Sequence, residues 1–212
     1  MGLACQMGRP GHGHKSATDW FGWKNRPVAT DANPAGSTRD DEIRVVFVCW
    51  GNICRSPMAE RVAERVAADA GLAGVRFTSA ATSTEELGAP IDHRAVRTLA
   101  AAGYRTGDHH AHQITAAEAH DADLVIAMEN LHLDRIRRIA GDTGNLSLLS
   151  DHDPDAVPGS GVPDPWYGGQ DGFDDTLAMI ESAIPGVLDE VRRLSDGSGS
   201  GPGREGTSPA GS

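Results

Sequence analysis

Short apolar runs alternate with amphipathic stretches through the middle of the chain. Runs rich in β-branched residues predict buried strands at about 43–48, 75–80, 123–128 and 145–149. Apolar residues at helical spacing predict helices at about 57–70, 92–103, 115–120, 131–139 and 173–194. Strands that alternate with helices predict an α/β fold, here a single domain with a four-stranded parallel sheet flanked by helices.

Both ends of the chain lack this periodicity. Residues 1–40 mix glycine, histidine, proline and polar residues, and we expect a disordered or loosely docked extension. A cluster of three aromatic residues within it either packs on the domain, binds a partner or is unstructured. Residues 195–212 are rich in glycine, serine and proline, which predicts a flexible tail. The folded domain is therefore expected at 41–194.

Composition narrows the class of protein further. The 212 residues carry a net charge of −11, which argues against nucleic-acid or acidic-membrane partners. Three cysteines do not form a disulfide framework, so a reducing, cytoplasmic location is expected. No apolar run approaches the roughly 18 residues of a membrane span, and the N-terminus lacks a secretory signal. Secretion by a route without a signal peptide stays open.

The most informative stretch follows the first predicted strand and ends at a predicted helix start. It reads Cys49-Trp50-Gly51-Asn52-Ile53-Cys54-Arg55-Ser56-Pro57. A loop that enters a helix can turn several backbone N–H groups toward one point, where the helix dipole adds positive potential. Arg55 supplies a planar fork that matches two phosphate oxygens. The same field favours the thiolate form of Cys49 as a nucleophile. The pattern predicts a site for a dianionic oxyanion.

The remaining loop residues suit such a site. Gly51 permits close backbone approach, Asn52 tolerates a left-handed conformation, and Ser56 can donate a hydrogen bond to a thiolate. The alternative is a buried structural cysteine beside a helix-capping serine. The preceding strand, the Gly-Asn pair and the Ser-Pro helix start together favour the functional interpretation.

A long loop at residues 150–172 is the second informative stretch. Within it, Asp164 lies between two prolines and next to Trp166 and Tyr167. A long loop in a compact domain is usually functional or disordered, and rigid prolines favour function. Cleavage of a phosphate ester by a thiolate requires protonation of the leaving oxygen, which a nearby carboxylic acid can supply. An Asp-Pro turn without chemistry is the alternative.

The loop from Cys49 to Ser56 resembles the signature loop of the low-molecular-weight protein tyrosine phosphatases, and further matches extend over about residues 43–193. The resemblance implies a flavodoxin-like fold of the phosphotyrosine phosphatase I type. It implies that Cys49 attacks phosphorus, that Arg55 binds the phosphate and that Asp164 is the general acid. It also implies a phosphate-binding loop and its supports. The loop comprises Trp50, Gly51, Asn52, Ile53, Cys54, Arg55 and Ser56, and its supports are Asn52, Ser56 and His109, of which His109 braces Asn52.

The chain departs from the family pattern around the cleft. Where the family usually has an aromatic dipeptide after the second strand, residues 81–86 end in Glu85-Glu86. Trp50 stands where a small or aliphatic residue is usual, and it either replaces the missing wall or packs on a neighbouring loop. The family often has two tyrosines after the Asp-Pro pair, and this chain has only Tyr167. We expect the substrate wall to comprise Trp50, Glu85, Trp166 and Tyr167.

The resemblance implies a tyrosine phosphatase that hydrolyses phosphotyrosine and other aryl phosphomonoesters through a cysteinyl-phosphate intermediate, with no metal and no cofactor. Its expected partners are a phosphotyrosine protein or peptide substrate and a tyrosine kinase, and the chain is expected to be a monomer. Cys54 either captures oxidised Cys49 in a disulfide or is simply a buried loop residue. Two alternatives stay open. One is an arsenate reductase that uses a low-molecular-weight thiol, and the other is a non-catalytic phosphopeptide-binding module.

Overall fold

A sheet of four parallel strands in the order β2-β1-β3-β4 forms the centre of the computed structural model, which describes residues 42–198. The strands are β1 (Ile43–Cys49), β2 (Val75–Ala81), β3 (Leu124–Ala127) and β4 (Leu146–Leu148). The predicted parallel α/β architecture is confirmed. The last strand is shorter than the expected 145–149, because the chain turns into a 3-10 helix, η3 (Leu149–His152), directly after it.

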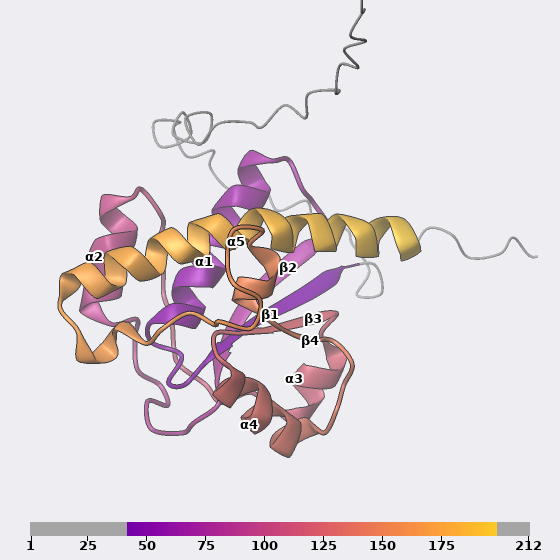
Figure 1. The fold of residues 1–212 in the computed structure, drawn as a ribbon, viewed down its shortest axis with the longest axis horizontal. Helices are drawn as coiled ribbons and strands as arrows, with labels where there is room; N and C mark the ends of the chain where they lie inside the picture. The colour runs from indigo at the N-terminus through magenta and orange to yellow at the C-terminus, as the bar shows by residue number, and fades with distance from the viewer. Residues whose placement is uncertain (1–41, 199–212) are drawn as a thin grey trace, which may run out of the picture. The chain divides into compact units, whose positions relative to one another are not determined.

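Helices cover both faces of this sheet (Figure 1). The helices are α1 (Arg55–Asp69), α2 (His93–Ala101), α3 (Ala116–Asp121), α4 (Asn130–Ala140) and α5 (Gln170–Ser198). Figure 1 shows α1, α2 and α5 on one side of the sheet and α3 and α4 on the other. Within residues 42–198, no helix combines the length and apolar character required to span a bilayer.

The helix boundaries that differ from the expected ones include the start of α1 and the end of α5. Helix α1 begins at Arg55 rather than Pro57, since the first residues of a helix need no intrahelical N–H donor and a proline is accepted there. Helix α5 ends at Ser198, four residues beyond the expected end at Leu194 and inside the segment expected to be flexible. The expectations for residues 1–40 and for 199–212 lie outside the described residues.

Strand β1 lies between two neighbours and is buried on both faces. Val45, Val46, Phe47 and Val48 are each at most 5% exposed. This explains why the strand reads as a continuous apolar run rather than an alternating one. On the side of α3 and α4, Val46 and Val48 join a cluster that includes Leu133 and Ile136 of α4. The central strand is therefore fixed rigidly, and so is the cysteine at its end.

The chemically informative residues follow the carboxyl ends of the strands. Cys49 ends β1 and pairs in register with Ala81, the last residue of β2. Glu85 follows β2, Glu129 follows β3, and Asp164 lies in the connection that follows β4. In open parallel sheets, ligands bind outside this edge. The topology alone therefore brings residues from four parts of the chain together.

The approach of α5 to η3 gives a test of the packing. A Cβ atom at Gly186 of α5 would overlap the backbone carbonyl oxygen of His152, whereas a Cβ at Gly197 of the same helix would meet nothing within 4 Å. We expect Gly186→Ala to lower the free energy of unfolding by about 1–3 kcal/mol through overpacking. Gly197→Ala is the matched control. Because alanine has a higher helix propensity than glycine, this variant should leave the free energy of unfolding unchanged or raise it by up to about 1 kcal/mol. Urea unfolding followed by circular dichroism measures both. Equal stabilities for the two variants would contradict the close approach.

Candidate active site

The loop of residues 50–54 leads from β1 into α1 and leaves backbone donors unpaired. Asn52 is the only non-glycine residue of the described chain with a positive φ, at 57°. Asparagine tolerates this left-handed conformation better than most residues. No residue in the described part of the chain accepts a hydrogen bond from the backbone N–H groups of residues 51–54. Backbone donors grouped in a turn at a helix N-terminus form a site for an anion.

The side chain of Asn52 is fully buried and holds the turn in place. Its Nδ2 donates to Ser56 Oγ at 3.0 Å and to Ser79 Oγ at 2.9 Å, and its Oδ1 accepts from the backbone N–H of His112 at 3.2 Å. His109 Nε2 lies 2.6 Å from the carbonyl oxygen of Asn52. A carbonyl only accepts, so Nε2 carries a proton. Burial lowers the pKa of His109. The structure thus places His109 against Asn52, as the resemblance implies.

A buried carboxyl group continues this network behind the loop. Ser79 Oγ donates to Glu60 Oε2 at 2.5 Å. Burial raises the pKa of Glu60, and the hydrogen bond from Ser79 opposes that effect. Arg61 Nη1 lies 3.2 Å from the other Glu60 oxygen. The hydrogen bonds therefore run from Asn52 through Ser79 to Glu60 on α1, and they tie the loop to the helix that follows it.

Cys49 lies at the centre of the loop with its sulfur beside a hydroxyl group. Its Sγ is 3.1 Å from Ser56 Oγ, and the residue is 3% exposed. If the sulfur is ionised it can only accept, so the Ser56 hydroxyl must then donate to it. Cys54 is also buried, and burial, together with the charge of Cys49, raises the pKa of the Cys54 thiol. The two cysteines therefore have different surroundings within the same loop.

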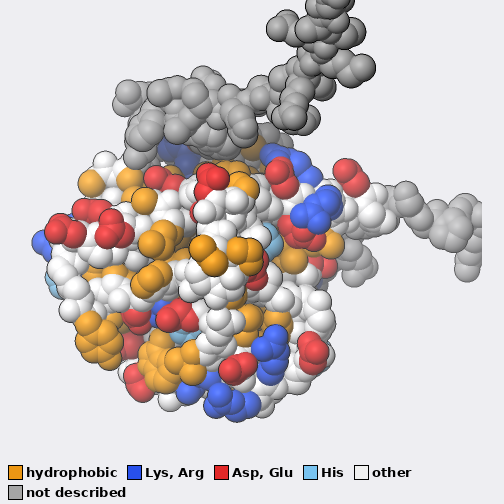
Figure 2. Space-filling view, viewed as in Figure 1, with side chains coloured by type: hydrophobic (Ala, Val, Ile, Leu, Met, Phe, Trp, Pro, Cys, Tyr) orange, Lys and Arg blue, Asp and Glu red, His pale blue; other side chains and the backbone are white. Residues whose placement is uncertain are grey.

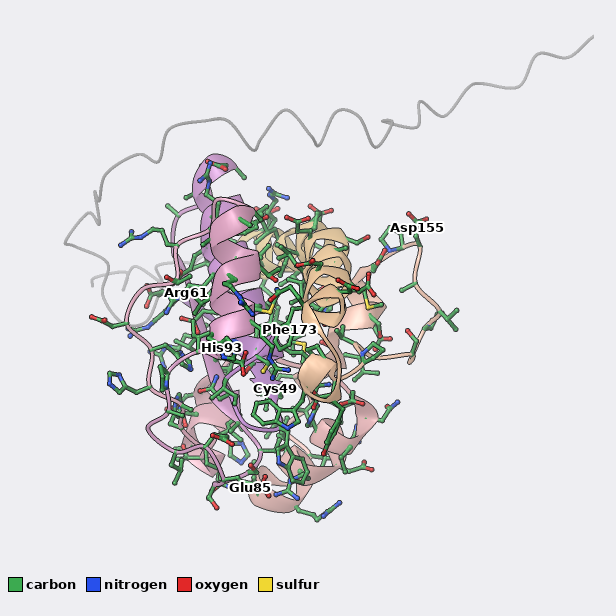
Figure 3. All side chains as sticks on the ribbon, turned by 90° about the vertical axis from the view of Figure 1, so that its left-hand side faces the viewer. Cys49, Arg61, Glu85, His93, Asp155 and Phe173 are labelled. Carbon is green, nitrogen blue, oxygen red and sulfur yellow. The ribbon has the colours of Figure 1, made fainter. Side chains whose placement is uncertain are left out.

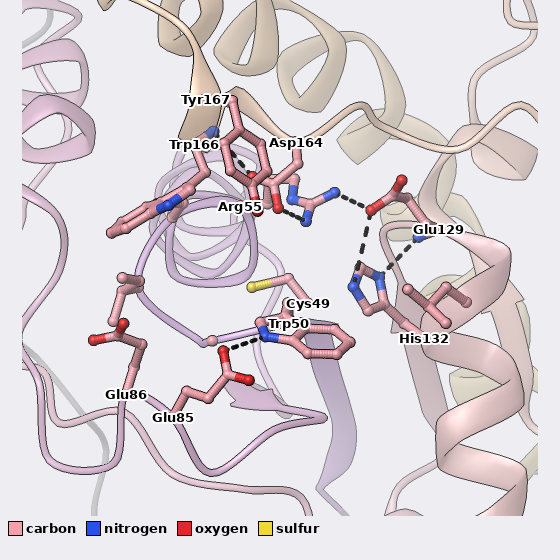
Figure 4. Close-up of a pocket in the computed structure, with 14 residues that line it drawn as sticks. Cys49, Trp50, Arg55, Glu85, Glu86, Glu129, His132, Asp164, Trp166 and Tyr167 are labelled. Carbon is pink, nitrogen blue, oxygen red and sulfur yellow. Dashed lines mark hydrogen bonds and ion pairs between the residues drawn. The ribbon is translucent and has the colours of Figure 1, made fainter.

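Arg55 is 1% exposed and lies between two carboxylates. Its Nη1 donates to Glu129 Oε2 at 2.5 Å and to the carbonyl oxygen of Val162 at 2.9 Å. Its Nη2 donates to Asp164 Oδ2 at 2.6 Å. Its Nε is buried and has no hydrogen-bond partner in the described chain. The guanidinium is thus fixed by its two outer nitrogens, while its Nε–H has no partner in the described residues (Figure 4).

Asp164 is held by the short 3-10 helix that it caps, η4 (Pro165–Tyr167). Its Oδ1 accepts from the backbone N–H of Trp166 at 3.1 Å, while Oδ2 binds Arg55. Figure 3 shows Asp155 far out on its loop, away from Cys49. Among the aspartates of residues 150–172, Asp164 is the one that lines the cleft. The structure therefore brings the predicted acid to the predicted cysteine and arginine.

Trp50 forms one wall and is fixed on two sides. Its indole Nε1 donates to Glu85 Oε2 at 2.8 Å. The Arg135 guanidinium carbon lies 4.4 Å from the centroid of its ring, in cation–π contact. Arg135 Nη2 is in turn held by the carbonyl oxygen of Thr82 at 3.1 Å. Trp50 therefore lines the cleft and also contacts the neighbouring loop after β2 through Glu85.

The opposite wall is held in a similar way. Trp166 is 41% exposed and Tyr167 is 93% exposed. The guanidinium carbon of Arg94 lies 5.2 Å from the Trp166 ring centroid and 4.6 Å from that of Phe173. Arg94 Nη1 also donates to the carbonyl oxygen of Trp166 at 3.1 Å. Each tryptophan therefore packs against an arginine that does not itself line the cleft.

These residues enclose a cleft of about 420 Å³ (Figure 4). It is lined by Cys49, Trp50, Gly51, Ile53, Cys54, Arg55, Glu85, Glu86, Glu129, Leu131, His132, Asp164, Trp166 and Tyr167. All four predicted wall residues are among them. Asn52 and Ser56 are fully buried and do not line the cleft, so their side chains support the loop from behind.

Sequence reasoning missed Glu129, Leu131 and His132, which line the cleft, and Arg135, which packs on the Trp50 ring. Glu129 follows the third strand by two residues, and the argument that singled out Cys49 at a strand end applied equally to it. His132 Nδ1 accepts the backbone N–H of Glu129 at 3.1 Å, and the residue is 1% exposed. Burial, with the charges of Arg55 and Arg135, lowers the pKa of His132 to about 4, although Asp164 opposes this effect. A neutral histidine therefore lies beside Glu129.

The described domain is similar in sequence and structure to known proteins. The model of the family described as low molecular weight phosphotyrosine protein phosphatase matches residues 44–196. A low molecular weight protein-tyrosine-phosphatase of Streptomyces coelicolor is 43% identical over 159 residues, which cover 73% of this chain and 96% of that protein. Low molecular weight protein-tyrosine phosphatase A of Mycobacterium bovis is 40% identical over 153 residues, or 71% of this chain and 93% of that protein. The crystal structure of YfkJ from Bacillus subtilis superposes with a TM-score of 0.68 at 29% identity, covering 74% of this chain and 99% of that one.

The depressed pKa of His132 predicts a pH effect on stability. The folded pKa is about 4 and the ordinary value is 6.5. The neutral form is therefore favoured by folding, and its stabilising contribution is complete above pH 6.5 and lost as the pH falls toward 4. This loss amounts to at most about 3 kcal/mol. We expect His132→Asn, which keeps an acceptor near the Nδ1 position, to lose less stability than wild type over this window. Urea unfolding at a series of pH values measures the difference, and parallel curves would contradict it.

Proposed function

The chain belongs to the low molecular weight phosphotyrosine protein phosphatase family, and from this premise we propose that Cys49 is its nucleophile, Arg55 its phosphate-binding residue and Asp164 its general acid. The chain is a hydrolase that acts on phosphoproteins. One observation carries the assignment of roles: the three side chains line the same cleft, although Asp164 is 109 residues away from Arg55 in the sequence.

In the first step, the Cys49 thiolate attacks the phosphorus of a phosphotyrosine in line with the ester bond. A sulfur–phosphorus bond forms and the bond from phosphorus to the tyrosyl oxygen breaks. Asp164, in its acid form, gives its proton to that oxygen as it leaves. Arg55 and the backbone N–H groups of residues 51–54 stabilise the charge on the equatorial oxygens. The product of this step is a phosphocysteine.

In the second step, water attacks the phosphocysteine. The Asp164 carboxylate takes a proton from the water, the sulfur–phosphorus bond breaks, and inorganic phosphate leaves. Cys49 departs as a thiolate, which the Ser56 hydroxyl accommodates by donating its hydrogen bond. Asp164 is then protonated again for the next turnover. The loop, the arginine and the aspartate suffice for both steps.

The remaining roles and partners are also proposals. Ile53, Cys54 and Gly51 shape the phosphate loop, and Trp166 and Tyr167 receive the tyrosyl ring together with Trp50. Capture of oxidised Cys49 by Cys54 stays a prediction. We further propose a cytoplasmic monomer whose substrates are phosphorylated by a tyrosine kinase.

Two substitutions test the roles of Cys49 and Asp164. Cys49→Ser should reduce hydrolysis of p-nitrophenyl phosphate and of a phosphotyrosine peptide to background, because serine is a far weaker nucleophile. Asp164→Ala should lower kcat by about 10²–10⁴. The loss should be larger for the peptide, since tyrosine is the poorer leaving group. Steady-state kinetics measures both.

The wild type should also be assayed for arsenate reduction with a low-molecular-weight thiol. Turnover of arsenate without turnover of either phosphate ester would contradict phosphatase activity and support the reductase alternative. Phosphopeptide binding without any turnover would support a non-catalytic module.

A third substitution tests the Trp50 wall. Trp50→Ala should raise KM for the phosphotyrosine peptide by about two- to tenfold, because stacking contributes about 0.5–1.5 kcal/mol. It should leave kcat nearly unchanged, since the ring contacts the substrate's aromatic group rather than the reacting atoms. Trp50→Phe keeps an aromatic face and is the matched control, with an expected change in KM below about twofold. A fall in kcat at constant KM would contradict the role of a wall.

A further inference from the structure

The charged residues that line the cleft are unevenly distributed within it. One arginine, Arg55, lines the cleft together with four acidic residues: Glu85, Glu86, Glu129 and Asp164. Glu129 and Asp164 are engaged with the buried Arg55 at the floor. Glu85 and Glu86 come from the loop after β2, on the other side of Cys49 (Figure 4). The floor therefore carries one arginine paired with two carboxylates, and the side carries two further carboxylates.

Glu85 and Glu86 have no cationic partner in the described chain. Glu85 is exposed, and its carboxylate accepts one hydrogen bond, from the neutral indole of Trp50. Within residues 42–198, the Glu86 side chain makes no hydrogen bond or ion pair, and a Cβ at Gly51 would lie 3.1 Å from its Cγ. Neither carboxylate is thus neutralised by a cation of the described chain, and the Glu86 methylene group lies close to Gly51 of the phosphate loop.

The nearby arginines do not neutralise this pair. Arg135 lies against the ring of Trp50 and donates to the Thr82 carbonyl, while Arg94 is paired with Asp92. Neither arginine lines the cleft. On the face seen in Figure 2, acidic and hydrophobic side chains lie next to one another at the lower left, around a hollow. A ligand in the cleft therefore meets the two glutamates directly.

The floor of the same cleft indicates what the ligand carries at its other end. Arg55 is 1% exposed, and its Nε is a buried donor without a partner in the described residues. The backbone N–H groups of residues 51–54 are unpaired in the described chain as well. These donors require an anion, whereas Glu85 and Glu86 require a cation. One ligand satisfies both only if it carries a phosphate at its tip and a positive charge beside it.

We propose that Glu85 and Glu86 make this cleft select phosphotyrosines that have lysine or arginine side chains next to them in the substrate. The proposal rests on the proposed function and adds the class of substrate. An acidic neighbour of the phosphotyrosine meets like charge at the same place and is disfavoured. Exposed charge pairs change binding by about 1.5- to fivefold each. With two glutamates, we expect kcat/KM to be about three- to tenfold higher for a lysine-flanked than for an alanine-flanked phosphopeptide.

The test compares three phosphotyrosine peptides that differ only in having lysine, alanine or glutamate on both sides of the phosphotyrosine. Wild type should rank them in that order by kcat/KM. The double variant Glu85→Gln/Glu86→Gln should bring the three values together, because it removes the charges. The amide that replaces the Glu85 carboxylate retains an oxygen that accepts the Trp50 hydrogen bond, so the wall stays in place. Raising salt from about 0.05 to about 1 M should also reduce the wild-type preference, through screening.

A matched control removes the same charge elsewhere. Asp121 and Asp142 are exposed and lie next to the amino ends of β3 and β4, at the opposite edge of the sheet. Asp121→Asn/Asp142→Asn should preserve the ranking of the three peptides. A ranking that is absent in wild type, or unchanged in the Glu85→Gln/Glu86→Gln variant, would overturn the proposal.

p-Nitrophenyl phosphate separates this proposal from the proposed function, because it has no flanking residues. Wild type should hydrolyse it whether or not it ranks the three peptides. Hydrolysis of p-nitrophenyl phosphate without a peptide preference would overturn the substrate class and leave the phosphatase activity standing. No hydrolysis of it by wild type would overturn both.

Discussion

The burial of one arginine determines how the loops around this cleft are arranged. A guanidinium taken out of water loses several kcal/mol of solvation unless charged or polar groups surround it. Arg55 is 1% exposed, and Glu129, Asp164 and the Val162 carbonyl supply those groups. They come from the connections after β3 and β4, whereas Arg55 begins the helix after β1. The arginine therefore fixes the position of Asp164, the proposed general acid, relative to Cys49, the proposed nucleophile, before any substrate contributes.

The phosphate loop is held from the other side by the hydrogen bonds of the Asn52 side chain. Hydrogen bonds to Ser56, Ser79 and His112 offset the cost of the left-handed conformation of Asn52. Because the Asn52 side chain makes the contacts that support the turn, the backbone N–H groups of residues 51–54 have no partner in the described chain. The two arrangements complement each other, since the arginine supplies a charge and the turn supplies dipoles for the same anion.

The sequence predicted the sheet, the phosphate loop and Asp164, because each depends on local signals. Strand β1 is a continuous apolar run, and the loop and the Asp-Pro pair are contiguous motifs. Glu129, His132 and Arg135 have no such motif. Their importance depends on the register of α4 against the sheet, which directs His132 toward the cleft and Arg135 toward the Trp50 ring. A contact between residues 85 positions apart, such as that of Arg135 with Trp50, has no signal in a single sequence.

The walls of the cleft, where the chain departs from the family pattern, depend on the same long-range contacts. A partly exposed tryptophan beside the cleft gives a defined surface only if its ring is held in one orientation. Arg135 and Glu85 provide this for Trp50, and Arg94 does so for Trp166. Glu85 thus has two effects, because the carboxylate that orients the indole also places a negative charge at the side of the cleft. An amide at that position would orient the ring without the charge. Glu85 therefore fixes both the orientation of the Trp50 ring and the negative electrostatic potential beside it. The proposed preference for basic residues next to the phosphotyrosine thus depends on the same side chain that holds the wall.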